Sequence, residues 1–196
     1  MSQSQTHTPS QSTPSTILNG LDTNQMGATV RAIQDQPIIA RFQFRAQNSW
    51  LGGARTRTTT TDFDGACQRH VHATPHVAET DEPAVLLGGD QNMNPGAVAL
   101  HALASCLCSS LIIHATARGI RVHKVETTLE GDVDVQGVLG LSPDVRNGYE
   151  GIRVAMRVEA DAPSEVIDEL VQIAQARSPV ADMLANPTPI SVRRVL

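Results

Sequence analysis

Two thiols two residues apart, Cys106 and Cys108, are the side chains of this sequence best suited to chemistry. A thiolate is a nucleophile, and a nearby arginine, lysine or protonated histidine stabilises it. On a helix the two cysteines lie about 200 degrees apart, so they face opposite directions and cannot form a disulfide without unwinding the helix. A free cysteine is often just a small buried hydrophobic side chain. The surroundings of these thiols therefore decide between chemistry and packing.

Two arginines on a predicted strand are the obvious cations for such a thiolate. The threonine-rich stretch ARTRTTTTDF (54–63) is typical of a strand, and Arg55 and Arg57 share one of its faces because side chains alternate along a strand. The predicted helix that carries the cysteines has no Asp or Glu of its own. If the strand lies across this helix, either guanidinium can stabilise a thiolate.

Three histidines near the third cysteine invite a metal interpretation. His70, His72 and His76 follow Cys67 in a stretch between residues 64 and 95 whose pattern predicts little regular structure. A His-x-His pair with a further histidine could bind zinc, but no Asp, Glu or second cysteine completes a recognisable set. We therefore favour a polar loop with partly exposed imidazoles, and we predict neither a metal nor a cofactor.

The two cysteines belong to a predicted helix over residues 94–118, around which the rest of the chain is organised. Asn94 fits the N-cap, Pro95 the first helical position and Gly119 the left-handed residue after the end. The helix is apolar on all sides, which predicts burial on all sides. Its length approaches a membrane span, but polar side chains interrupt it and favour a core helix of a soluble protein. These are His101, Ser105, Ser109, Ser110 and His114, and we expect the two histidines to be hydrogen-bonded core or interface residues rather than bases.

The remaining pattern predicts an α+β fold with a largely antiparallel sheet. We expect strands over residues 28–33, 38–46, 54–63, 84–87, 121–135, 149–160 and 189–196, and helices over 164–177 and 179–185. Strands in blocks are typical of the α+β class. The composition of residues 1–24, rich in Ser, Thr, Gln and Pro, predicts a disordered or loosely packed tail, which leaves a single domain over 25–196. Because one small sheet cannot cover an all-apolar helix, we also expect a two-fold homodimer.

Composition narrows the function classes. The chain has 196 residues, a formal net charge of -5 and only 3% aromatic residues. The negative charge and the lack of basic runs argue against nucleic-acid binding. An odd number of cysteines, three, does not make a disulfide framework and favours a reducing cytoplasm. The N-terminus has neither a basic segment nor an apolar one, so it does not predict a signal peptide.

Several short motifs together resemble the OsmC-like family, that of osmotically inducible protein C and the organic hydroperoxide resistance proteins. They are Asn94-Pro95 with Cys106 twelve residues after the Asn, ALASC (102–106), HATARGI (114–120), Ser178-Pro179-Val180 and NPTPISV (186–192). The resemblance covers residues 28 to 196. It implies an intertwined homodimer in which two antiparallel sheets wrap long central helices, with active sites at the subunit interface.

The resemblance also implies roles for particular residues. Family peroxidases use a thiolate that attacks an organic hydroperoxide, an arginine held by a glutamate, and a resolving cysteine whose disulfide an external thiol reduces. The attacking cysteine corresponds to Cys106 and the arginine to Arg57. The resolving cysteine corresponds to Ser178, which cannot form a disulfide. The glutamate after Asn-Pro is replaced by Gly96 and Ala97, and Asp90 is a candidate substitute.

These departures exclude the family's two-cysteine cycle and leave two functional hypotheses. In the first, Cys106 reduces organic hydroperoxides in a one-cysteine cycle, and a small external thiol or Cys67 resolves its sulfenic acid. In the second, the chain keeps the fold without turnover and binds a small apolar or thiol-reactive ligand at the dimer interface. The ionisation of the Cys106 thiol separates the two hypotheses.

Overall fold

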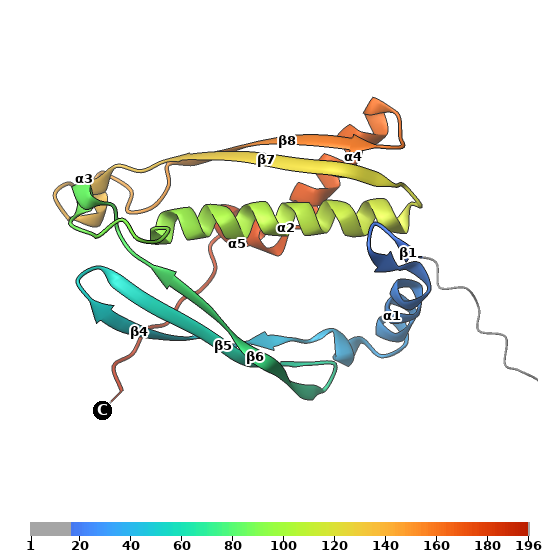
Figure 1. The fold of residues 1–196 in the computed structure, drawn as a ribbon, viewed down its shortest axis with the longest axis horizontal. Helices are drawn as coiled ribbons and strands as arrows, with labels where there is room; N and C mark the ends of the chain where they lie inside the picture. The colour runs from blue at the N-terminus through green and yellow to red at the C-terminus, as the bar shows by residue number, and fades with distance from the viewer. Residues whose placement is uncertain (1–16, 196) are drawn as a thin grey trace, which may run out of the picture.

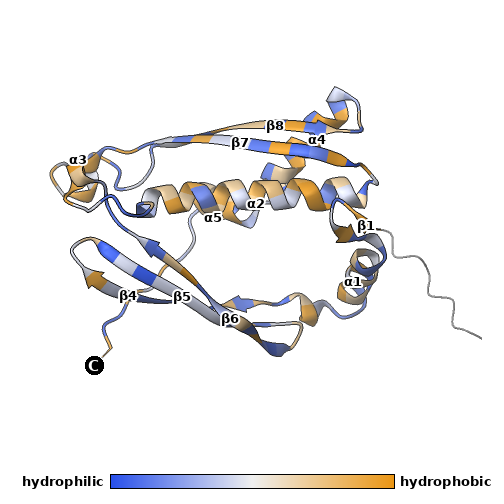
Figure 2. Cartoon of the chain, viewed as in Figure 1, coloured by the Kyte–Doolittle hydropathy of each residue, from blue (hydrophilic) through white to orange (hydrophobic). Residues whose placement is uncertain are grey.

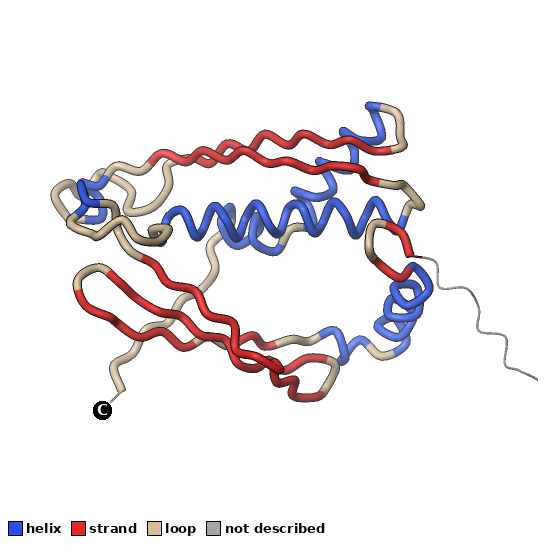
Figure 3. The backbone as a smooth tube through the Cα atoms, in the orientation of Figure 1, coloured by secondary structure: helices blue, strands red, loops and turns tan. Residues whose placement is uncertain are grey.

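The computed structural model describes residues 17–195 and places a long helix, α2, between two layers of sheet (Figure 1). On one side of α2 lie the β7–β8 hairpin and helix α4; on the other lies a four-stranded sheet (Figure 3). The N-terminal half has the elements β1 (Ile17–Leu18), β2 (Leu21–Asp22), α1 (Thr23–Asp35), η1 (Pro37–Ala40), β3 (Gln43–Phe44), β4 (Gln47–Gly52), β5 (Arg55–Gly65) and β6 (Gln68–Thr80). The C-terminal half has η2 (Ala84–Leu86), α2 (Pro95–Ala117), β7 (Val122–Asp132), α3 (Val135–Val138), β8 (Gly151–Ala160), α4 (Ser164–Arg177) and α5 (Pro179–Ala185). All strand pairs are antiparallel, which confirms the α+β class.

The signals at both ends of α2 are confirmed. The Asn94 side chain accepts a hydrogen bond of 2.7 Å from the backbone N–H of Ala97, which satisfies one of the donors that a helix leaves free at its start. Pro95 occupies the first turn, where its missing N–H costs nothing. After the last turn Gly119 adopts a φ of +72°, a conformation that suits glycine.

The hydrophobic core lies between α2, α4 and the β7–β8 hairpin. Leu111 and Ala115 of α2 pack with Leu170 and Ala174 of α4, and all four are fully buried. Partly buried residues of β7 and β8, such as Val125, complete this cluster. The predicted helices over 164–177 and 179–185 are confirmed as α4 and α5, and the predicted strands over 121–135 and 149–160 as β7 and β8.

Helix α2 is buried on one face only, in contrast to the expected burial on all sides. Its buried positions are Leu103, Leu107, Ser110, Leu111, Ala115 and Thr116. On another face Ile113 is 47% exposed. By length and composition alone α2 could cross a membrane, and 22% of its most apolar window is buried within the subunit, but core helices of soluble proteins meet the same criterion.

The four-stranded sheet stands apart from the helices. Strand β5 pairs with β6 on one edge and with β3 and β4 on the other. Within the described residues these strands make no more than marginal contact with any helix. Large apolar side chains on the sheet are therefore open to solvent, among them Phe44 at 76% and Trp50 at 74% exposure. Figure 2 shows several hydrophobic positions among the polar ones along these strands.

Two strands predicted near the N-terminus are wrong or shorter than expected. Residues 28–33 belong to helix α1, because Asp22 caps the backbone N–H groups of Asn24 and Gln25 and starts a helix before the alternating stretch begins. In the predicted strand 38–46 only Gln43–Phe44 forms a strand, and its first three residues belong to the short helix η1, which Pro37 starts. Six alternating residues do not by themselves distinguish a strand from a helix.

Three further expectations are corrected along the chain. Residues 64–76 are not a loop but the end of β5 and most of β6, joined by a turn in which Ala66 and Cys67 have positive φ. The sequence has no glycine at these two positions, so the usual turn signal is missing. Residues 84–87 form the short helix η2 rather than a strand. Residues 189–195 have no regular secondary structure, are exposed, and pair with no strand of the described chain.

The beginning of the described chain is attached to the end of α2. Residues 1–16 of the predicted tail lie outside the described residues, whereas 17–22 form a small hairpin. The Asn19 side chain donates to Thr116 Oγ1 and to the carbonyl of Ile120, and it accepts from the backbone N–H of Val122. These three hydrogen bonds hold the hairpin against the turn between α2 and β7.

Candidate functional site

Cys106 lies in the middle of α2, at the border between the buried and the exposed face. Leu107, next to it, is 4% exposed, whereas Ser105 and Ser109 face solvent. Cys106 and Cys108 are both free and partly buried. The thiol of Cys106 is therefore neither sealed in the core nor fully open to water.

Arg55 and Arg57 are held by one carboxylate, that of Glu79 on the neighbouring strand. Arg57 Nε and Nη2 donate to Glu79 Oε1 at 2.9 and 2.6 Å, and Arg55 Nη2 donates to Glu79 Oε2 at 3.3 Å. The antiparallel register of β5 and β6 places Arg57 directly opposite Glu79. Hydrogen bonds from Arg57, and then from Arg55, hold the pKa of Glu79 below its usual value. The two arginines thus have an orienting carboxylate.

Glu79 is the functional candidate that the sequence did not reveal. Its role depends on the pairing of β6 with β5, and the sequence of residues 64–76 did not predict a strand. One signal was present: alternate residues of β6 face the same side, so a glutamate opposite an arginine-rich strand is an obvious partner once the hairpin is known. The proposed substitute, Asp90, is exposed and forms no ion pair with either arginine in the described chain.

The structure also explains why no side chain follows Asn94-Pro95. A Cβ atom at Gly96 would lie 2.9 Å from the hydroxyl oxygen of Tyr149, closer than real Cβ contacts. The ring of Tyr149 is packed in turn against Gly131 of β7, where a Cβ would lie 2.6 Å from ring carbons. Tyr149 therefore occupies the space in which a glutamate at position 96 would begin.

The loop between β6 and α2 is built on a buried aspartate. Asp81 is fully buried and accepts hydrogen bonds from the backbone N–H groups of Glu82, Gly89 and Gln91 at 2.8, 3.1 and 3.3 Å. Burial raises the pKa of this carboxyl, but the three hydrogen bonds outweigh burial and leave the pKa below its usual value. Asp81 therefore stays ionised and fixes the loop that leads into α2.

Ser178 has a structural role at the position of the family's resolving cysteine. Its side chain is buried and accepts a hydrogen bond of 3.1 Å from the backbone N–H of Ala181, which makes it the N-cap of α5. Serine is a strong N-cap residue, and α5 packs against α2. Ser178 stabilises a helix start, and a hydroxyl there cannot resolve a sulfenic acid.

Cys67 and the three histidines lie on the other sheet. Cys67 is exposed in the turn between β5 and β6, so no loop carries it over α2. The His70 ring stacks on Phe63 with centroids 4.8 Å apart, and the His72 and His76 rings meet edge to face at 4.5 Å. Among the described residues no three of the His, Cys, Asp and Glu side chains are arranged to hold a metal ion. The three imidazoles instead pack against aromatic rings of the same sheet, since His72 also contacts Phe63.

The arginines and Cys106 lie on different layers of the subunit. Figure 1 shows β5 in the sheet opposite α2. No hydrogen bond or ion pair in the described chain joins Arg55 or Arg57 to α2. The chain therefore carries an ordered arginine–glutamate cluster and a partly buried thiol on separate layers.

The sequence and the fold were compared with those of known proteins. The family model described as OsmC-like protein matches residues 88–193, which include α2, Cys106 and Ser178 but not strand β5. The fold is similar to the OsmC-like protein of Mycoplasma pneumoniae, with a TM-score of 0.55 and 16% identity over 74% of this chain and 89% of that one.

A putative osmotic stress induced and detoxification response protein from Psychrobacter arcticus 273-4 is similar as well. It has a TM-score of 0.54 and 15% identity over 70% of this chain and 85% of that one. A comparison with curated protein sequences gave no match. From the motifs around α2, the observed fold and the family match, we conclude that the chain belongs to the OsmC-like protein family.

Proposed function

We propose that this chain is a redox protein of the stress-response type, in which Cys106 reduces organic hydroperoxides in a one-cysteine cycle. The observation that carries the proposal is the arginine–glutamate cluster. Glu79 binds Nε and Nη2 of Arg57, and within the described residues Nη1 forms no hydrogen bond, on a side chain that is 51% exposed. A guanidinium fixed in this way can stabilise a thiolate and the negative charge that develops on a departing alkoxide.

The proposed cycle balances without a second protein thiol. The Cys106 thiolate attacks the distal oxygen of the hydroperoxide, the O–O bond breaks, and the alcohol leaves with a proton while the sulfur becomes a sulfenic acid. An external thiol then condenses with the sulfenic acid and releases water. A second external thiol reduces the mixed disulfide and restores Cys106. The free state of the three cysteines is consistent with a reducing compartment such as the cytoplasm.

We further propose that the working unit is a homodimer whose sites are shared between subunits. Three features support it: the exposed face of α2 around Ile113, the uncovered four-stranded sheet, and the unpaired segment 189–195. A second copy that lays its α2 against this sheet would bury both apolar surfaces. The same arrangement would bring Cys106 of one subunit to Arg57 of the other.

Kinetics of the thiol test the chemistry. Arg57→Ala and Glu79→Gln should each slow the second-order reaction of Cys106 with cumene hydroperoxide by about tenfold or more, a loss of roughly 1.4 kcal/mol of transition-state stabilisation. Cys108→Ser is the matched control on the same helix and should react as the unmodified chain does. Mass spectrometry after one equivalent of peroxide should place the added oxygen on Cys106. Unchanged rates in both arginine-cluster variants would contradict the proposed role of the cluster.

Mixed dimers test the shared site. Under the proposal a Cys106→Ser homodimer is inactive, and an Arg57→Ala homodimer keeps about a tenth of the activity or less. If the site is shared, random mixing restores one complete site in half of the dimers, which gives about a quarter of the unmodified activity. If each site lies within one subunit, mixing restores nothing.

A thiol that titrates near the ordinary value of about 8.5 and reacts slowly would favour a non-catalytic, ligand-binding relative instead.

A further inference from the structure

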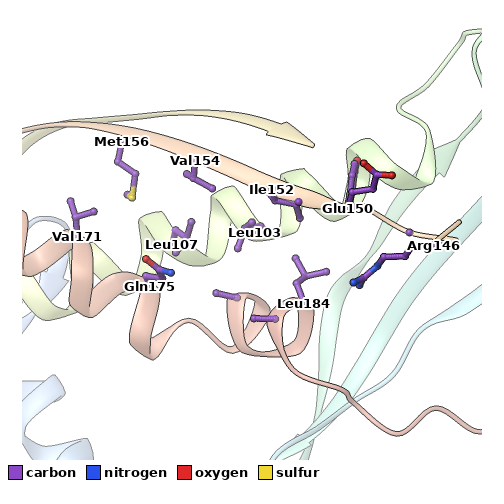
Figure 4. Close-up of a pocket in the computed structure, with 15 residues that line it drawn as sticks. Leu103, Leu107, Arg146, Glu150, Ile152, Val154, Met156, Val171, Gln175 and Leu184 are labelled. Carbon is purple, nitrogen blue, oxygen red and sulfur yellow. The ribbon is translucent and has the colours of Figure 1, made fainter. Parts of the chain in front are cut away.

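A large cavity lies between α2, β8, α4 and α5. Its volume is about 690 Å³, within the range of small-molecule sites. Leu103 and Leu107 of α2 line it, together with Met156 of β8 and Val171 of α4. Figure 4 shows these side chains converging from different elements. Cys106 and Ser178 are not part of its wall. The cavity is therefore distinct from the proposed peroxide site.

One end of this cavity carries charged side chains, and the rest is mostly apolar, with Gln175 as a neutral polar exception near Val171. Figure 4 places Arg146 at the end opposite Val171, with Ile152 and Leu184 between them. The sites that bind small molecules typically have such an apolar interior with a few polar groups that fix orientation. The arrangement fits a ligand with one polar head and one hydrocarbon chain.

The polar end carries hydrogen-bond donors without partners. Within the described chain the Arg146 guanidinium forms no ion pair or hydrogen bond, and the Tyr149 hydroxyl forms no hydrogen bond. The space beside Gly96 holds the Tyr149 oxygen, so the hydroxyl lies at the first turn of α2, where the helix dipole is positive. Burial raises the Tyr149 pKa, which keeps the phenol protonated and able to donate.

Glu150 lines the same end, and its negative charge disfavours the binding of an anion there. No ion pair joins it to Arg146 in the described chain, and Figure 4 shows its carboxylate pointing away from that guanidinium. Arg146 thus remains free to bind another acid. Removing the charge of Glu150 should strengthen the binding of an anion and leave that of a neutral ligand unchanged.

We propose that this cavity binds an acyl carboxylate, with the chain among Leu103, Leu107 and Met156 and the head at Arg146 and Tyr149. A guanidinium binds a carboxylate through charge-assisted hydrogen bonds, and the phenol adds a neutral one. The hydrocarbon chain gains from leaving water at each methylene. The inference does not rest on the peroxidase proposal, because neither Cys106 nor the Arg57 cluster takes part.

Calorimetric titration of the full chain tests the inference, with straight-chain carboxylates from octanoate to dodecanoate below their critical micelle concentrations. Each added methylene should lower Kd about fourfold until the cavity is filled. Arg146→Gln should weaken decanoate binding by about tenfold or more and change 1-decanol binding by less than about twofold. Arg157→Gln, on β8 but outside the cavity wall, is the matched control. Glu150→Gln should tighten decanoate binding alone.

Two further variants complete the test. Leu184→Trp should block decanoate and decanol alike, because Leu184 lines the cavity and its 39% exposure leaves room for a larger side chain without disrupting the core. Cys106→Ser should bind decanoate as the unmodified chain does. The inference is overturned if decanoate does not bind, as when a second copy fills the cavity. It is also overturned if Arg146→Gln weakens acid and alcohol equally, or if Cys106→Ser abolishes binding.

Discussion

Leu111 is the side chain on which the packing of α2 against α4 most depends. It is fully buried and lies against Leu170 and Ala174, which are also fully buried. Replacing Leu111 by alanine removes three carbons, worth about 2.4 kcal/mol of transfer free energy at about 0.8 kcal/mol each. Because the surroundings of a truncated core side chain relax only partly, a cavity remains, and the total cost should reach about 3–5 kcal/mol.

Urea unfolding followed by far-UV circular dichroism measures this cost. With a typical slope of about 1–3 kcal/mol per molar, the midpoint should fall by at least about 1 M. Leu139→Ala is the matched control: Leu139 is 65% exposed, so the same substitution should cost only about 0.8 kcal/mol. If Leu111→Ala costs no more than Leu139→Ala, the α2–α4 contact does not form the core and the reasoning fails.

Three further predictions concern the groups that hold α2 and its surroundings in place. Gly131→Ala should cost about 1–3 kcal/mol in urea unfolding, because its Cβ meets the Tyr149 ring, and adding Tyr149→Ala should recover part of that loss. Asn94→Ala should cost about 0.5–2 kcal/mol through the lost cap, whereas Asn94→Asp should retain most of the stability. Hydrogen bonds from Arg69 above all hold the pKa of Asp62 below its ordinary 3.8, so this group stabilises the fold above that pH and the stability is lost as the pH falls further. The urea midpoint should therefore decline below about pH 4, and less steeply in Asp62→Asn; an equal decline would contradict the role of Asp62.

The local signals of the sequence were sufficient to predict α2, β7 and β8. Asn94, Pro95 and Gly119 marked both ends of α2, and the alternation over 121–135 and 149–160 marked β7 and β8. These signals act within a few residues: a cap satisfies donors one turn away, and alternation records which side of a strand is buried. For this reason these signals predict the elements correctly without knowledge of the rest of the chain.

The predictions from sequence failed where an element depends on residues far away in the chain. The turn at Ala66 and Cys67 has no glycine, so β6 was not recognised, and with it the pairing of Arg57 with Glu79 was hidden. Residues 189–195 have the alternation of a strand but find no partner in the described chain. Strand pairing requires two segments, and the pattern of one segment does not identify the other.

The sequence by itself determined the family, the long central helix and the position of Cys106 on it. Each of these depends on residue identity and on short spacings. Only the tertiary structure decided that Glu79 orients Arg57, that Tyr149 fills the space beside Gly96, and that the thiol and the arginines lie on separate layers. Those features arise from contacts between residues far apart in the chain, whose side chains meet only when sheets and helices pack.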